Sequence, residues 1–115
     1  MLEIRNQIIG IDHGELVLFS DCDTNGAMWS GTGTRERSQW VAFSEPFAAP
    51  PSVTVALTMW DIAKTSNIRA DLRAEGVTAE GFELIFRTWE DTQVARVRVR
   101  WQALCVLPSD DIWAV

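Results

Sequence analysis

The residues with the clearest potential for binding chemistry lie in the run Arg87-Thr88-Trp89-Glu90-Asp91-Thr92. A large aromatic in a polar corner between two apolar runs points to contact with a ligand or partner, so Trp89 is the first candidate. Glu90 and Asp91 are adjacent carboxylates, which point to opposite faces of a strand and form no acid/base pair unless the corner distorts. The usual explanation of such a pair is a solvated turn.

A second group of oxygen ligands follows the first apolar run. Asp21, Asp23 and Asn25 alternate along the chain and precede Gly26, as in the first half of a calcium-binding loop. Position twelve of such a loop supplies a bidentate Glu, but this chain has Thr32 there. The alternative is that Asp and Asn side chains bond their own backbone in a surface turn.

Catalysis finds no support in the sequence. His13 is the only histidine, and no serine lies in a recognisable nucleophile elbow. Cys22 and Cys105 are too few and too far apart for a disulfide scaffold or a zinc site, so both are expected to be reduced, with Cys105 in the core. These observations predict a protein that is not an enzyme and has no cofactor.

Composition limits the class of protein further. The 115 residues are 47% hydrophobic and 23% charged, which fits one globular domain. A net charge of -6 provides no basic field for nucleic acid. No apolar run suits a signal peptide or reaches the roughly 18 residues of a membrane-spanning helix. We therefore expect no membrane insertion and a cytoplasmic location, with release by a route that needs no signal left open.

Period-two alternation predicts the elements that must position these residues. Proline and glycine turns separate the apolar runs, and no segment has the periodicity of a helix, so the pattern predicts an antiparallel sandwich or barrel. Six strands are expected, at Glu15–Phe19, Gln39–Phe43, Ser52–Met59, Asn67–Ala74, around Phe82, Leu84 and Phe86, and over Val94–Trp101.

The last strand carries a row of cations. Arg96, Arg98 and Arg100 alternate with apolar residues and so share one face. Like charges on one face of a strand repel each other, so they require carboxylates. These come either from a neighbouring protomer or from adjacent strands, where the candidates are Glu83, Asp71 and Glu75.

An ordered set of short motifs between Thr34 and Ala103 resembles the H-type lectin domain, the domain type that also forms the C-terminal part of discoidins. The motifs are Phe43-x-x-Pro46-Phe47-x-x-Pro50-Pro51-x-Val53, Asp61, Asn67-Ile68-Arg69, Gly81-Phe82, Thr88-Trp89-x-x-Thr92-x-Val94 and Val99-x-Trp101. The resemblance implies an all-β fold, a six-stranded antiparallel β-sandwich that forms trimers, sometimes stacked as hexamers. It also implies that galactose or N-acetylgalactosamine binds in shallow sites between subunits.

The resemblance extends to individual site residues. Arg69 matches a strand arginine that reaches the sugar, and Trp89 matches the aromatic that covers its apolar face. Glu90 stands where members that favour N-acetylgalactosamine have histidine, and Thr32 where the family has a loop acid. Ser30 falls on the family's small residue two positions before that acid. We therefore expect a carbohydrate site with altered specificity, centred on Trp89, Glu90 and Arg69.

The sequence thus predicts an N-terminal strand and polar loop over residues 1–33, a lectin-like sandwich over 34–107 and a tail over 108–115. The expected function is non-catalytic glycan binding by a homo-oligomer, a trimer or hexamer, with a role in cell adhesion. The alternative is a structural or assembly module, such as a domain of a phage-like particle or surface fibre, that keeps the scaffold without binding sugar.

Overall fold

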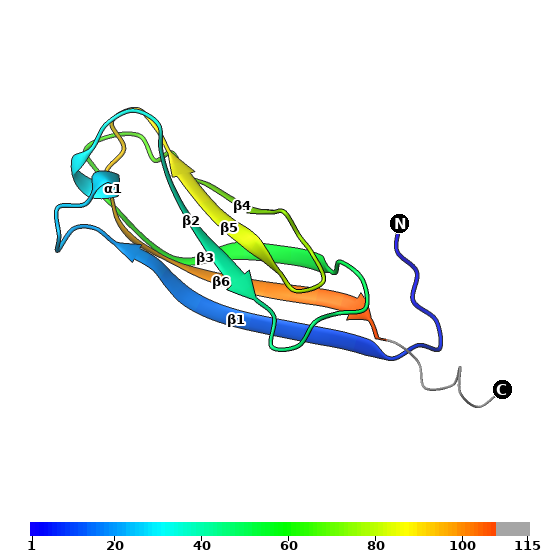
Figure 1. Cartoon of the computed structure of the whole chain (residues 1–115). Coiled ribbons are helices and arrows are strands. Elements are labelled where there is room, and N and C mark those ends of the chain that lie inside the picture. Colours follow the sequence, from blue (N-terminus) through cyan, green and yellow to red (C-terminus); the bar gives the residue numbers. More distant parts are fainter. Residues whose placement is uncertain (108–115) are drawn as a thin grey trace.

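The computed structural model describes residues 1–107, and the predicted tail 108–115 lies outside them. Two three-stranded antiparallel sheets pack face to face (Figure 1). One sheet has the order β1-β6-β3, formed by Ile9–Ser20, Val94–Val106 and Ser52–Ile62. The other has the order β2-β5-β4, formed by Arg35–Ala42, Gly81–Thr88 and Asp71–Glu75. The predicted six-stranded antiparallel sandwich is confirmed, and one short helix, α1 (Ala27–Ser30), follows β1.

The period-two pattern fills the space between the sheets. The inward residues of β5 and β6 are almost completely buried, namely Phe82, Leu84, Phe86, Val97, Val99, Trp101 and Ala103. Aromatic rings join the two sheets: the ring of Phe19 in β1 lies 5.5 Å from that of Phe86, and Phe82 lies 5.6 Å from Trp101. Burial of these large rings is the main source of stability in such a sandwich.

The first strand is longer than its sequence pattern indicates. It pairs with β6 from Ile9 to Ser20, whereas the alternation predicts only residues 15–19. The inward positions of its first half include two glycines, Gly10 and Gly14, which add no apolar signal. A Cβ at Gly14 would lie 2.6 Å from Nε1 of Trp101, so the indole occupies the space that a side chain would need. The glycine that weakens the pattern is required by the packing.

The fourth strand is shorter than predicted, because it begins at Asp71 and not at Asn67. Side chains hold the backbone before it. The hydroxyl of Thr88 donates to the carbonyl of Arg69 at 2.6 Å, and that of Thr92 donates to the carbonyl of Asn67 at 2.7 Å. These carbonyls therefore bond side chains in place of a neighbouring strand. No helix in residues 1–107 has the length and apolar character needed to cross a membrane.

Candidate functional site

The corner between β5 and β6 lies at one end of the sandwich, beside α1 and the connection from β3 to β4 (Figure 1). Trp89 is half-buried there, and the guanidinium carbon of Arg87 lies 5.4 Å from the centre of one of its rings. Glu90 is exposed and has a φ of 57°, in the left-handed region that non-glycine residues seldom adopt. The corner thus turns sharply immediately after the tryptophan.

Arg69 reaches this corner from the connection that precedes β4. Its Nη1 donates to Oδ1 of Asp91 at 2.9 Å and to Oγ1 of Thr92 at 3.1 Å. The side chain of Asp91 is 71% exposed, so the ion pair opens to solvent. Within residues 1–107, Nε and Nη2 of Arg69 donate no hydrogen bond, which leaves them free for the hydroxyls of a ligand.

The loop around α1 lies against the same corner. The amide of Gly33 donates to the carbonyl of Glu90 at 2.9 Å, and the side-chain amide of Gln93 donates to the carbonyl of Trp29 at 3.1 Å. Thr32 is exposed beside Gly33. The hydroxyl of Ser30 donates to carbonyls of its own loop, at 2.8 and 3.0 Å. The structure therefore gathers the predicted site residues at one end of the sandwich, with Ser30 already hydrogen-bonded.

Asp21 has a structural role in this loop. It is buried, and its Oδ2 accepts from the amide of Met28 at 3.0 Å and from Nη2 of Arg37 at 2.8 Å. Asp23 and Asn25 are both exposed. No group of three or more His, Cys, Asp or Glu side chains in residues 1–107 is placed to hold a metal ion. Calcium binding by Asp21, Asp23 and Asn25 stays a prediction that a chelator tests directly.

The arginine row of β6 finds its acids in its own sheet. Nε of Arg96 lies 3.2 Å from Asp61 in β3, and Nε of Arg98 lies 3.3 Å from Glu15 in β1. Arg100 forms no ion pair with any carboxylate of residues 1–107. The partners named from the sequence were wrong, because Glu83, Asp71 and Glu75 belong to the other sheet.

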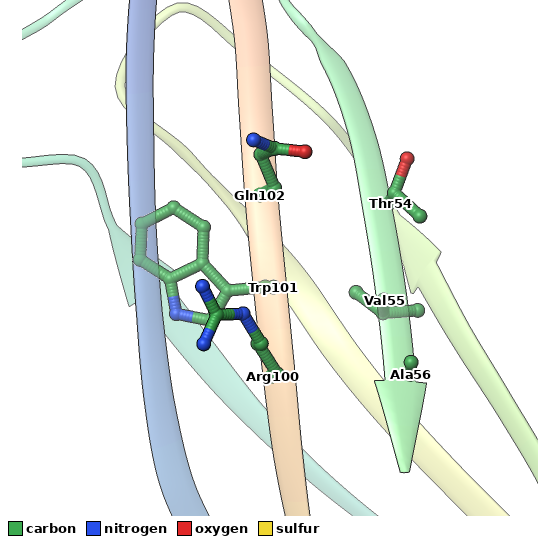
Figure 2. A pocket seen from close by; sticks show the side chains of 6 residues that line it. All are labelled: Thr54, Val55, Ala56, Arg100, Trp101 and Gln102. Atoms are coloured by element: carbon green, nitrogen blue, oxygen red, sulfur yellow. The ribbon is translucent and has the colours of Figure 1, made fainter. Parts of the chain in front are cut away.

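A shallow depression of about 150 Å³ lies between β3 and β6, lined by Thr54, Val55, Ala56, Arg100, Trp101 and Gln102 (Figure 2). Arg100 and Gln102 belong to the middle of β6, whereas the corner precedes the start of that strand. The depression is therefore separate from the cluster around Arg69. It contains no acid that could pair with Arg100, and it does not contribute to the candidate site.

Two residues of the cluster were not assigned a role from the sequence. Asp91 is the carboxylate on Arg69, although the pattern favours a solvated turn for it, and Glu90 is not among the hydrogen-bond partners of Arg69. Arg35 is buried beneath the corner. No sequence signal identifies either contact, because both depend on which loops the fold brings together.

Comparison with known families establishes the class of this domain. The profile of the H-type lectin domain matches residues 38–104, more than half of the chain. The chain belongs to the H-type lectin domain family. The matched span of this H-type lectin domain contains Arg69 and the corner at Trp89, but not Ser30, Thr32 or β1.

Individual relatives agree with this membership. A protein of Fuscovulum blasticum described as "ATP synthase subunits region ORF 7" is 44% identical over 107 residues, which cover 93% of each chain. A discoidin-1 polypeptide of Dictyostelium discoideum is 30% identical over 80 residues, 69% of this H-type lectin domain and 32% of that protein. The solved structure of recombinant discoidin II of Dictyostelium discoideum shares the fold, with a TM-score of 0.77 and 23% identity. The similarity covers 93% of this chain and 41% of that one.

Proposed function

We propose that this H-type lectin domain is a non-catalytic carbohydrate-binding protein whose sugar site lies at the Trp89 corner. The observation that carries the proposal is the solvent-open ion pair of Arg69 and Asp91, two residues from a half-buried tryptophan. A guanidinium with free N–H groups donates to sugar hydroxyls, a carboxylate accepts from them, and an indole face covers sugar C–H groups. Family membership supports the same function.

The proposed ligand is a galactose-like or N-acetylgalactosamine-like sugar at the end of a glycan. Arg69 and Asp91 form the polar centre of the site, and Trp89 supplies the apolar surface. Glu90 and Thr32 are proposed as contacts at the rim, since both are exposed beside this centre. The carboxylate expected of the family at Thr32 is then replaced by carboxylates from the corner.

A glycan array with the wild-type protein, run with and without a calcium chelator, tests the function. Binding that survives chelation supports the proposal and argues against a calcium site at Asp21, Asp23 and Asn25. Binding that chelation abolishes would make these three residues metal ligands. A protein that binds no glycan would favour the alternative, a structural or assembly module on the same scaffold.

Substitution of the two corner carboxylates separates their roles. Asp91→Asn is expected to weaken glycan binding by about ten-fold or more, because a hydrogen bond to a charged acceptor contributes roughly 1.5–3 kcal/mol. Glu90→Gln is the matched control and is expected to cost less, because Glu90 makes no ion pair with Arg69. Isothermal titration with the best array ligand measures both. A larger loss for Glu90→Gln would move the acceptor to Glu90.

We further propose that the protein acts as a homo-oligomer, a trimer or stacked hexamer, in which neighbouring subunits complete each site. Weak monosaccharide sites reach useful avidity only when several bind together. The outer face of the β1-β6-β3 sheet supports this assembly. Ile9 and Ile11 are 43% and 56% exposed there, opposite half-buried Val106 and Leu104. An apolar patch at a sheet face favours contact with another copy.

Sedimentation at micromolar concentration is expected to give a trimer or hexamer. Ile11→Asp is expected to shift the distribution toward monomer, because it places an unpaired carboxylate in the proposed contact. Trp40→Asp is the control, since Trp40 is 46% exposed on β2 of the other sheet. A wild-type protein that sediments as a monomer would refute the proposed assembly.

A further inference from the structure

Arg35, at the start of β2, is a buried arginine without an acidic partner. Its residue is only 9% exposed, and no carboxylate of residues 1–107 forms an ion pair with it. All of its hydrogen bonds go to main-chain carbonyls. They run from Nε to Gly33 at 2.9 Å, from Nη1 to Ala27 at 3.3 Å and Met28 at 3.1 Å, and from Nη2 to Glu90 at 3.1 Å and Thr92 at 2.8 Å.

These five carbonyls match the five N–H donors of a guanidinium. They belong to the α1 loop, to the residue before β2, and to the corner more than fifty residues later in the chain. Burial lowers the pKa of Arg35 from its ordinary value, because water no longer solvates the charge. A fully bonded buried cation joins these segments more rigidly than apolar packing alone could.

We propose that Arg35 is a positioning residue that holds the Trp89 corner against the α1 loop and so fixes the carbohydrate site. The inference rests on the proposed function of that site. Arg35 itself touches no ligand. It acts through the carbonyls of Glu90 and Thr92, which flank Asp91, the acceptor beside Arg69.

Two further observations show how closely the loops are fitted. The left-handed backbone of Glu90 is strained for a glutamate, and its carbonyl accepts from both Arg35 and the amide of Gly33. A Cβ at Gly31 would lie 2.5 Å from the carbonyl oxygen of Ala27 and 3.1 Å from Cδ of Arg35. The loop therefore wraps the guanidinium stem at a distance that only glycine allows.

Arg37 offers a matched control. It lies two residues further along β2, where its Nη2 donates to Asp21 at 2.8 Å and its guanidinium lies 5.2 Å from the centre of the Phe19 ring. It bonds the start of the α1 loop but no residue of the corner. Arg37→Met and Arg35→Met each remove one partly or fully buried cation from the same strand, and only the second releases the corner.

Two measurements on the intact chain test the proposal. Arg35→Met is expected to weaken binding of the best array glycan by about ten-fold or more, with Arg35→Lys intermediate and Arg37→Met within about two-fold of wild type. Amide exchange of Gly33, whose N–H donates to Glu90, is expected to accelerate by about ten-fold in Arg35→Met relative to Arg37→Met. Exchange requires no sugar, so it tests the positioning role even if the wild type binds no glycan.

The outcomes separate this inference from the function on which it rests. Unchanged glycan affinity and unchanged Gly33 exchange in folded Arg35→Met would overturn the positioning role. Wild-type protein without glycan binding, but with Gly33 exchange raised by Arg35→Met, would overturn the lectin function and keep the role in holding the corner. If Arg35→Met does not fold, Arg35→Lys decides, because an ammonium keeps the charge but cannot reach all five carbonyls. Wild-type affinity and exchange in Arg35→Lys would then contradict the proposal.

Discussion

Arg69→Ala is expected to weaken glycan binding by about ten- to one-hundred-fold, because the site loses its charged donors, each bond contributing roughly 1.5–3 kcal/mol. The substitution also frees Asp91, whose Oδ1 accepts from Nη1 of Arg69 at 2.9 Å. A single change thus removes a donor and disorders the acceptor beside it. The fold should survive, since the Thr92 hydroxyl still donates to the carbonyl of Asn67.

Arg69→Lys is the informative control for this result. Lysine keeps the positive charge but cannot present two parallel N–H groups to neighbouring hydroxyls, so we expect an intermediate affinity. Trp89→Ala should also reduce affinity, through loss of the apolar surface that covers the sugar. Titration calorimetry and thermal unfolding measure affinity and stability together. Unchanged binding in both Arg69→Ala and Trp89→Ala would place the sugar elsewhere on the protein.

The parts of the fold that follow a strict alternation could be predicted from the sequence. Phe82, Leu84 and Phe86 repeat every second residue because one face of β5 is buried and the other is not. The same physics reveals β6. The pattern is lost where packing demands glycine, as at Gly14 beneath Trp101, and where side chains bond the backbone, as at Arg69 before β4.

The site was predictable only in part, for a related reason. Trp89 and Arg69 are recognisable from residue type and spacing, since each matches a motif of the family. The ion pair of Arg69 with Asp91 joins positions 22 residues apart, and the contact of Arg35 with the corner spans more than fifty. Such contacts are set by the way loops meet at the end of the two sheets. Local patterns of charge and hydropathy carry no record of them.

Phe86→Ala is expected to give the largest loss of stability of any change considered, about 3–5 kcal/mol. Phe86 is completely buried in β5, and its ring lies 5.5 Å from that of Phe19 in the facing sheet. Truncation leaves a cavity between two sheets whose strands are fixed by main-chain hydrogen bonds and cannot collapse fully. A domain of this size has a free energy of unfolding of about 5–15 kcal/mol, so the loss is a large share.

Denaturant unfolding of Phe86→Ala beside Ile85→Ala provides the test, at one fixed protein concentration because an oligomer gains stability with concentration. Ile85 is the neighbouring residue of β5, half-buried on the outer face, and its truncation should cost less than half as much. Phe86→Leu should fall between the two, since leucine fills most of the space. Equal losses at positions 85 and 86 would mean that both faces of β5 are covered in solution. The β2-β5-β4 face, and not only the face of the opposite sheet, would then take part in contacts between protomers.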